Sequence, residues 1–173
     1  MPCRKGGYKY LVDLTDNLTG WTEAKPLKNI KSDNIAKFLF EVMCRYGCIV
    51  QLMVDNGSEF HGATQVLMDK YKVPIVRTSA YNPAANGKVE RGHGVWIESI
   101  WKVLKGRTNE WPDLIGYALW ADRVTTKGTT GYLPYYLLYG QHPLMPFNIM
   151  DKTFYALDWP SVYMTKDLLA MRI

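Results

Sequence analysis

The sequence predicts an α/β domain with a mixed sheet flanked by helices, and three observations lead to this prediction. Short apolar runs bounded by turn residues open the chain, and segments with helical periodicity then interleave with further short runs. In addition, 47% of the 173 residues are hydrophobic, which is enough for one domain with a sizeable core. The composition therefore excludes a disordered chain.

The first elements have the pattern of a β-hairpin. Residues 7–14 form a mostly apolar run that follows the turn-forming glycines Gly6 and Gly7. Residues 17–20 have turn chemistry, and residues 21–26 are the expected returning strand.

Residues 32–46 are predicted to form a helix, because apolar residues recur on one face with the helical period. These residues are Ile35, Phe38, Leu39, Val42, Met43 and Tyr46. Ser32 is expected as the N-cap, and Gly47 fits the position that ends the helix.

The alternation then continues. Residues 49–54 suit a buried strand, and residues 61–71 are predicted to be helical. Residues 73–77 form a short strand, which Pro74 places near an edge of the sheet because proline cannot donate to a ladder.

After the loop of residues 78–87, helices are expected over 88–104 and over 112–126, the second with proline in its first turn. Regular structure is expected to thin out beyond them. We therefore divide the chain into a core domain, residues 1–126, and a C-terminal extension, residues 127–173.

The cysteines and the aromatic residues are expected to have structural roles. Cys3, Cys44 and Cys48 are an odd set without a secretion signal, and no second Cys or His pair accompanies them. This argues against a disulfide framework and against a zinc site. The aromatic residues expected in the core or at a helix–helix contact are Trp111, Tyr117 and Trp120.

The formal net charge of +5 favours an anionic partner, although a solvated basic face would give the same sum. No apolar run approaches the roughly 18 residues that a membrane span needs. The first residues also lack the apolar stretch of a signal peptide. We therefore expect an intracellular protein with no membrane partner.

Two carboxylates are candidates for metal chemistry. Asp55 directly follows a predicted buried strand, although a turn-forming aspartate would have the same pattern. Glu90, with 34 residues between it and Asp55, lies in the first turn of a predicted helix, where the helix dipole also favours an acid. As a pair they suit phosphoryl transfer, because two metal ions need oxygen ligands from several rigid elements.

Four segments resemble the catalytic core of retroviral and retrotransposon integrases. VDNGSEF at 54–60 is similar to their second-aspartate strand and turn, and YNPAANGKVERGH at 81–93 to their active-site loop and glutamate helix. GWTEAKPL at 20–27 resembles their third strand, and TTGYLPYYLLYGQHP at 129–143 the segment after the core in gypsy-type LTR retrotransposons. The resemblance covers nearly the whole chain, and it implies an RNase H-like fold.

The resemblance also implies a reaction and its catalytic residues. Asp55 and Glu90 match two acidic metal ligands of a polynucleotidyl transferase that processes DNA 3′ ends and transfers them into DNA. Mg²⁺ or Mn²⁺ is the implied cofactor, in a two-metal mechanism. DNA is the implied partner, a homodimer or higher oligomer the implied assembly, and the nucleus the implied location.

The family's first catalytic aspartate is expected on a strand upstream of residues 7–14, and the chain begins at Met1 without it. We therefore expect an N-terminally truncated core that lacks its first strand and is inactive as given. Asp13 and Asp16 are alternative third ligands, although Asp16 matches a non-catalytic acidic position at the end of the family's second strand.

Residues near the candidate acids are expected to contact DNA. They are Tyr81, Asn82, Lys88, Arg91 and His93. Basic side chains there would contact phosphates, although a solvated helix face would have the same composition. Glu59 either orients the site or is a surface residue after a turn.

Three hypotheses for the function of the chain stay open. The chain is either an integrase core or a non-catalytic relic or domesticated nucleic-acid-binding module that keeps Asp55 and Glu90. A different RNase H-like nuclease is the third hypothesis, but it predicts acidic positions that do not match this loop and spacing.

Overall fold

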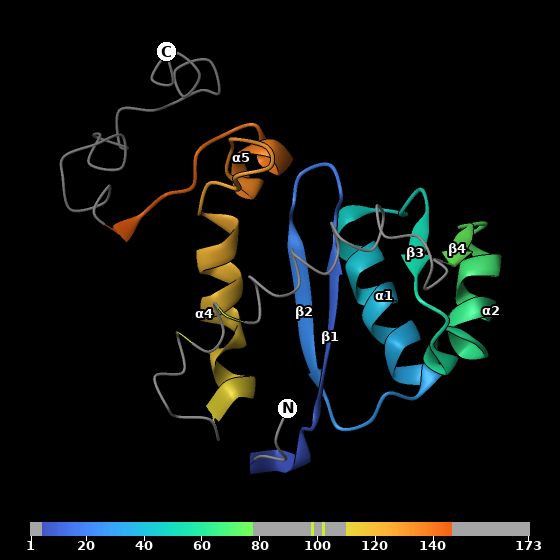
Figure 1. Cartoon of the computed structure of the whole chain (residues 1–173). Helices are drawn as coiled ribbons and strands as arrows, with labels where there is room; N and C mark the ends of the chain where they lie inside the picture. Colours follow the sequence, from blue (N-terminus) through green and yellow to red (C-terminus); the bar gives the residue numbers. More distant parts are fainter. Residues whose placement is uncertain (1–4, 78–97, 99–101, 103–109, 147–173) are drawn as a thin grey trace, which may run out of the picture.

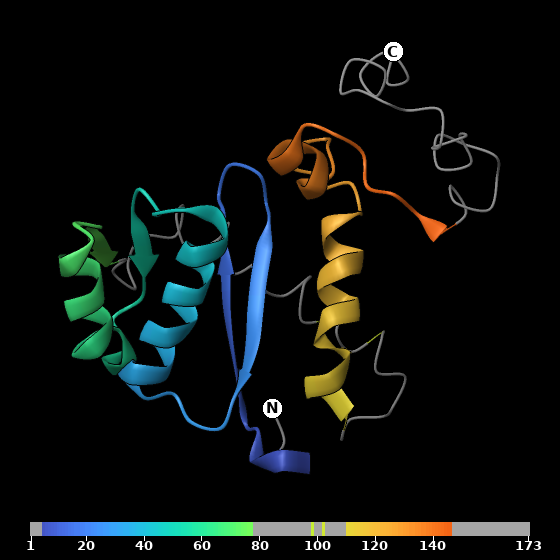
Figure 2. The ribbon, with the colours of Figure 1, turned by 180° about the vertical axis from the view of Figure 1, so that it is seen from behind.

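The computed structural model describes residues 5–77, 98, 102 and 110–146. Helix α4 (Trp111–Arg123), a two-stranded hairpin and helix α1 (Ser32–Tyr46) follow one another as layers, with the hairpin between the two helices (Figure 1). The view from behind shows the same order of layers (Figure 2). Within the described part of the chain, no helix combines the length and the apolar character that a membrane crossing requires.

Strands β1 (Tyr10–Thr15) and β2 (Thr22–Leu27) form the predicted antiparallel hairpin. β1 begins at Tyr10 rather than at residue 7. The reason is that Gly6 and Gly7 have φ angles of 83° and 78°, which place a short 3₁₀ turn ahead of the strand.

Helix α1 (Ser32–Tyr46) has the predicted bounds. It buries Ile35, Phe38, Leu39, Val42 and Met43. Gly47 follows with a φ of 87°, and its N–H donates to the Met43 carbonyl at 2.8 Å. The prediction of Ser32 as the N-cap is wrong, because Lys31 holds the cap position without a side-chain hydrogen bond. The Ser32 hydroxyl instead bonds to Thr64 of another helix.

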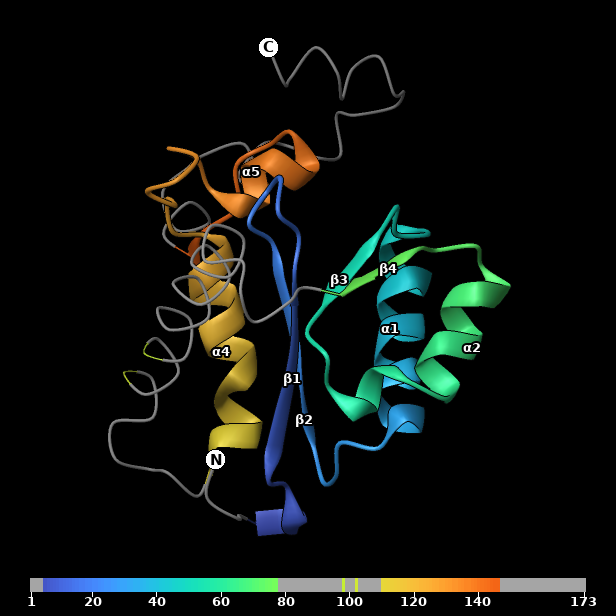
Figure 3. The ribbon, with the colours of Figure 1, turned by 45° about the vertical axis from the view of Figure 1, so that its right-hand side comes forward.

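Strands β3 (Leu52–Val54) and β4 (Ile75–Arg77) form a parallel pair, and helix α2 (Ala63–Lys70) connects them (Figure 3). Parallel strands need such a crossover connection. The Pro74 carbonyl accepts the N–H of Leu52 at 3.0 Å. Proline has no N–H, so Pro74 bonds to β3 through its carbonyl. In the described two-stranded sheet both strands are end strands, so the edge position of β4 stays a prediction.

The described strands form two separate two-stranded sheets, β1–β2 and β3–β4. β1 lies on the side of the hairpin that faces the second pair (Figures 1 and 2). Both pairs rest on α1, because Val12 and Leu14 of β1 join Leu52 and Val54 of β3 in one core cluster with the buried face of that helix. The pairing is mixed, as predicted, and no strand within the described ranges joins the two pairs.

Helix α4 (Trp111–Arg123) covers the opposite face of the hairpin, where Leu11 and Ala24 pack against it. The core position predicted for Trp111 is confirmed, since its side chain is 1% exposed. The core position is wrong for Tyr117 and Trp120, which are 65% and 47% exposed. Helical spacing places these two rings on the outer face of α4.

A short helix, α5 (Pro134–Tyr139), lies where regular structure was expected to thin out. It begins at a proline and ends before Gly140, whose φ of 68° is typical of a helix C-terminus. The rings of Tyr135 and Tyr139 contact Trp21, with centroid separations of 6.2 and 5.5 Å. Part of the predicted C-terminal extension therefore packs on the hairpin.

Candidate functional site at the end of strand β3

Asp55 lies at the carboxyl end of β3, as predicted. The buried residues Leu52 and Val54 fix this strand in the core, whereas Asp55 is exposed. Its Oδ1 accepts the backbone N–H of Gly57 at 2.9 Å, while Oδ2 has no hydrogen-bond partner among the described residues. Asp55 therefore holds a turn with one oxygen and presents the other to solvent from a rigid base.

A second carboxylate packs on the same turn. Glu59 lies in the 3₁₀ turn η2 (Ser58–Phe60), and a methyl group on Gly57 would lie 2.6 Å from one of its carboxylate oxygens. The absence of a side chain at Gly57 therefore makes room for Glu59 beside the turn that Asp55 organises. This placement is compatible with the orienting role considered for Glu59.

The two alternative third ligands have different positions. Asp13 is paired with Ala24 in the middle of the hairpin, and strand alternation places it on the face that α4 covers. Asp16 lies in the turn between β1 and β2, where its Oδ2 accepts the N–H and the hydroxyl of Thr19 at 2.9 and 2.6 Å. Asp16 thus stabilises the hairpin turn.

Most of the predicted site lies outside the described residues. These residues are Tyr81, Asn82, Lys88, Glu90, Arg91 and His93. The approach of the Glu90 carboxylate to Asp55 therefore stays a prediction. Two residues of the predicted helix 88–104 are described, and they form an ion pair of 3.0 Å between Glu98 and Lys102 at the helical i, i+4 spacing.

The chemistry of Asp55 fits a hard divalent cation, because Mg²⁺ and Mn²⁺ prefer carboxylate oxygens on rigid elements. Within the described ranges, no group of three or more His, Cys, Asp or Glu side chains could hold a metal ion. Cys44 and Cys48 are free and exposed. The predicted second ligand, Glu90, lies outside these ranges.

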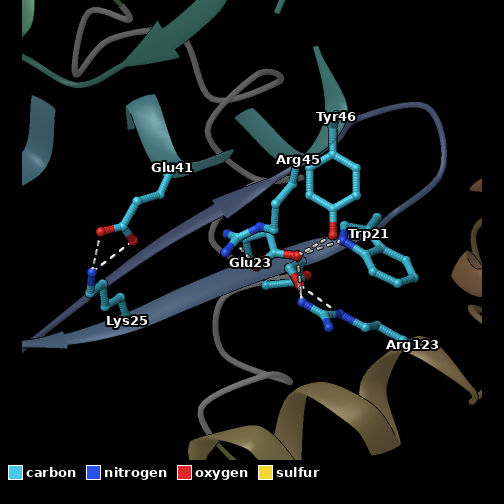
Figure 4. A network of polar contacts seen from close by, with 8 residues as sticks. Trp21, Glu23, Lys25, Glu41, Arg45, Tyr46 and Arg123 are labelled. Carbon is cyan, nitrogen blue, oxygen red and sulfur yellow. Dashed lines mark hydrogen bonds and ion pairs between the residues drawn. The ribbon is translucent and has the colours of Figure 1, made fainter. Parts of the chain in front are cut away.

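The sequence did not predict a polar network that is centred on strand β2 (Figure 4). Its centre is the buried carboxylate of Glu23 on β2. Arg45 of α1 donates to Oε2 at 3.0 Å, and Arg123 of α4 donates to Oε1 at 2.8 Å. Tyr46 and the Trp21 indole N–H also donate to Oε1, at 2.6 and 3.0 Å. One carboxylate thus ties the hairpin to helices on both of its faces.

The network also changes the pKa of one of its members, Tyr46. Burial, the hydrogen bond to Glu23 and the charge of Glu23 raise the pKa of Tyr46 from 10.0 to about 12. Arg123 further donates to the Thr22 carbonyl at 2.7 and 3.0 Å, and its guanidinium lies 4.2 Å from the Trp21 ring centroid. The contacts of Arg123 therefore fix α4 on the hairpin independently of any ligand.

Comparison with known proteins links this architecture to retroviruses. The chain is 38% identical over 151 residues to a Gag-Pol polyprotein of avian reticuloendotheliosis virus, covering 86% of this chain. It is 35% identical to the Pol polyprotein of radiation murine leukemia virus (strain Kaplan) over 79% of the chain, and 34% identical to the Gag-Pol polyprotein of feline leukemia virus over 80%. The chain spans 13%, 24% and 8% of these polyproteins. No family model matches it.

Solved structures of integrases share the fold of this chain. The HTLV-2 integrase catalytic core domain, solved with magnesium in a trimeric form, superposes with a TM-score of 0.64 at 20% identity, over 79% of this chain and 89% of that one. The chain has the fold of a retroviral integrase catalytic core. The catalytic core of BIV integrase superposes with the same TM-score at 21% identity, over 75% of this chain and 85% of that one.

A third structure shows this integrase-core fold in a larger assembly. It is an intasome of simian T-cell lymphotropic virus in complex with the PP2A regulatory subunit B56 gamma, with a TM-score of 0.67 at 20% identity. The match covers 79% of this chain and 50% of that one. The RNase H-like fold expected from the four sequence segments is therefore confirmed.

Proposed function

We propose that this chain is the catalytic core of a DNA integrase that acts on DNA ends with Mg²⁺ or Mn²⁺. The observation that carries the proposal is the exposed Asp55 carboxylate at the end of buried strand β3. No described residue bonds to its Oδ2, which is therefore available to a cation, while its Oδ1 accepts the N–H of Gly57. Glu90 is the proposed second ligand, from the helix that follows the loop.

In this proposal Asp55 and Glu90 would hold the divalent metal, which would supply Lewis-acid polarisation of the phosphodiester and activation of the attacking oxygen. Asp55 binds the metal, and the Gly57 N–H orients the carboxylate. Glu59 lies beside this turn and orients it further. Lys88, Arg91 and His93 are the proposed phosphate contacts near Glu90, with Tyr81 and Asn82 at the DNA end.

A paramagnetic titration tests the metal site. Mn²⁺ is expected to broaden the backbone amide resonance of Gly57, because that amide bonds to the proposed ligand. The broadening should disappear in Asp55→Asn and persist in Asp33→Asn, a variant of another exposed acid in the first turn of α1. Equal broadening in the two variants would remove Asp55 from the metal site.

Joining of DNA ends in the presence of Mn²⁺ tests the reaction. Joining is measured both for this chain and for a form extended upstream of Met1, since an inactive core was predicted for the chain by itself. In the form that joins DNA, activity should fall at least about 100-fold in Asp55→Asn and in Glu90→Gln, since each loses a metal ligand, and it should survive in Asp33→Asn. Salt-dependent DNA binding without joining, equal in the parent and in Asp55→Asn, would favour the non-catalytic nucleic-acid-binding module instead.

We also propose a source and an assembly. The segment at 129–143 supports a gypsy-type LTR retrotransposon as the source, and the nucleus is the proposed location because the proposed reaction acts on chromosomal DNA. The exposed rings of Tyr117 and Trp120 on one face of α4 support self-association, because such apolar surface commonly marks an interface.

A further inference from the structure

An arginine lies next to the candidate metal ligand in the β3–β4 pair. Arg77 is the last residue of β4, and its register partner is Val54, the residue before Asp55. Neighbouring residues of parallel strands share a face, so Arg77 extends on the side of helix α2. The exposed guanidinium reaches two side chains at the start of that helix, Gln65 and His61.

The side chains of Gln65 and His61 hold this guanidinium. Its Nη2 donates to the Gln65 amide oxygen at 3.1 Å and lies 3.4 Å from Nδ1 of His61. A guanidinium only donates, so the contact with His61 is a hydrogen bond when Nδ1 is the acceptor of the ring. No carboxylate within the described ranges forms an ion pair with Arg77. No described carboxylate therefore neutralises this positive charge.

The partners of Arg77 are themselves fixed. Gln65 donates its amide N–H to Asp69 at 2.9 Å, one helical turn further, which orients the amide oxygen toward Arg77. The backbone carbonyl of His61 accepts from the Ser32 hydroxyl.

The start of α2 is anchored beneath these groups. Thr64 is fully buried, and it bonds to Ser32 and to the Glu59 carbonyl. A preorganised donor binds an anion without losing the entropy of ordering a free side chain. The arrangement thus differs from a scattered surface arginine.

We propose that Arg77, oriented by Gln65 and His61, binds a backbone phosphate of DNA beside the reacting end. We define these three residues as the Arg77 cluster. The guanidinium fork suits phosphate oxygens, and its Nε and Nη1 groups make no hydrogen bond within the described part of the chain. This proposal rests on the DNA-binding function proposed above, and it assigns the cluster to positioning rather than to catalysis.

The test measures duplex DNA affinity of the full chain at several salt concentrations, for the parent and three variants. Arg77→Ala should lose about tenfold in affinity, the equivalent of one charge-assisted contact. It should also reduce the slope of log K against log salt by about 0.9, for one phosphate fewer. Lys70→Ala removes the same charge at the other end of α2 and should leave both quantities nearly unchanged.

Gln65→Ala separates positioning from charge. It removes the acceptor that orients Arg77 and keeps every cation, so affinity should fall about threefold while the salt slope stays at the parent value. The proposal for the Arg77 cluster would be overturned if Arg77→Ala lost no more DNA affinity than Lys70→Ala. If the parent still bound DNA in a salt-dependent way, the DNA-binding function would stand.

Failure of the parent to bind duplex DNA at low salt would overturn the proposed function instead. Inorganic phosphate then decides the anion site by itself. Titration should shift the Nε–H resonance of Arg77 and the side-chain amide of Gln65, and the Gln65 shift should vanish in Arg77→Ala. No shift of either group in the parent would overturn the site.

Discussion

Glu23 of β2 and Arg123 of α4 form an ion pair with 2.8 Å between Oε1 and Nη2, across 100 residues of sequence. Arg45 of α1 contacts the other oxygen of the same carboxylate at 3.0 Å. The hairpin is thus fastened to both helical layers at a single side chain. The stability of the layered arrangement should depend on that carboxylate more than on any exposed ion pair.

Glu23→Gln is expected to lower the free energy of unfolding by about 3 kcal/mol, because it leaves two guanidinium groups without their anion. Urea denaturation measures the change. The matched control is Glu41→Gln, which breaks the exposed pair between Lys25 and Glu41 on the same strand and helix. The control should cost at most about 1 kcal/mol. Equal losses in the two variants would contradict a special role for Glu23.

Stability should fall in alkaline solution through Tyr46. Its pKa is raised from 10.0 to about 12 in the folded protein, first by burial and then by Glu23. A raised pKa means that the fold favours the neutral phenol. The contribution is therefore fully present below pH 10 and is lost as the pH rises toward 12.

Tyr46→Phe tests this dependence. The urea midpoint of the variant should fall less steeply above pH 10 than that of the parent, because the variant has no phenol to ionise there. Tyr117→Phe is the control, since that ring is 65% exposed and makes no comparable contact with Glu23. A parent and a Tyr46→Phe protein with the same pH slope would disprove the linkage.

Asp16→Ala should destabilise the hairpin by about 1–2 kcal/mol, because the N–H and hydroxyl of Thr19 lose a charged acceptor. Asn17→Ala, in the same turn, should change stability by less than about 0.5 kcal/mol. Asp16→Asn distinguishes the turn from a metal role, since an amide oxygen can still accept from Thr19. Loss of metal-dependent activity in a well-folded Asp16→Asn protein would identify Asp16 as a ligand after all.

Self-association should depend on the outer face of α4. Replacement of both Tyr117 and Trp120 by lysine places two charges on this apolar surface, and sedimentation should then show a shift toward the monomer. Leu18→Lys changes another exposed apolar residue, in the hairpin turn, and should leave the mass distribution unchanged. A double variant that associates like the parent would place the interface elsewhere.

The local patterns in the sequence predicted most of the described elements. Helix α1 has its predicted bounds because the apolar period lies within the helix and Gly47 directly follows it. Asp55 was found in the same way, from an apolar run that ends at turn residues. Helix α5 was missed because it has only six residues, begins at Pro134 and is followed by Gly140, and both of these residues are typical of loops.

The contacts between distant residues could not be predicted in this way. Ser32 has the chemistry of an N-cap, but Thr64 recruits its hydroxyl from another helix. Glu23 looked like any polar strand residue, because its partners Arg45 and Arg123 lie 22 and 100 positions away. Tyr117 and Trp120 were assigned by residue type, whereas their exposure follows from which face of α4 the hairpin covers.

The division of the described strands into two ladders has a consequence for how the molecule opens. Hydrogen bonds couple β1 to β2 and β3 to β4, but no strand in the described ranges extends either ladder into the other. Among the described residues, the two ladders are therefore connected by side chains that pack on α1. Fraying of one ladder can then leave the other intact, and backbone amides in the two pairs would exchange with solvent as separate units. Amides of α1 would be the slowest to exchange, since their release requires both units to open.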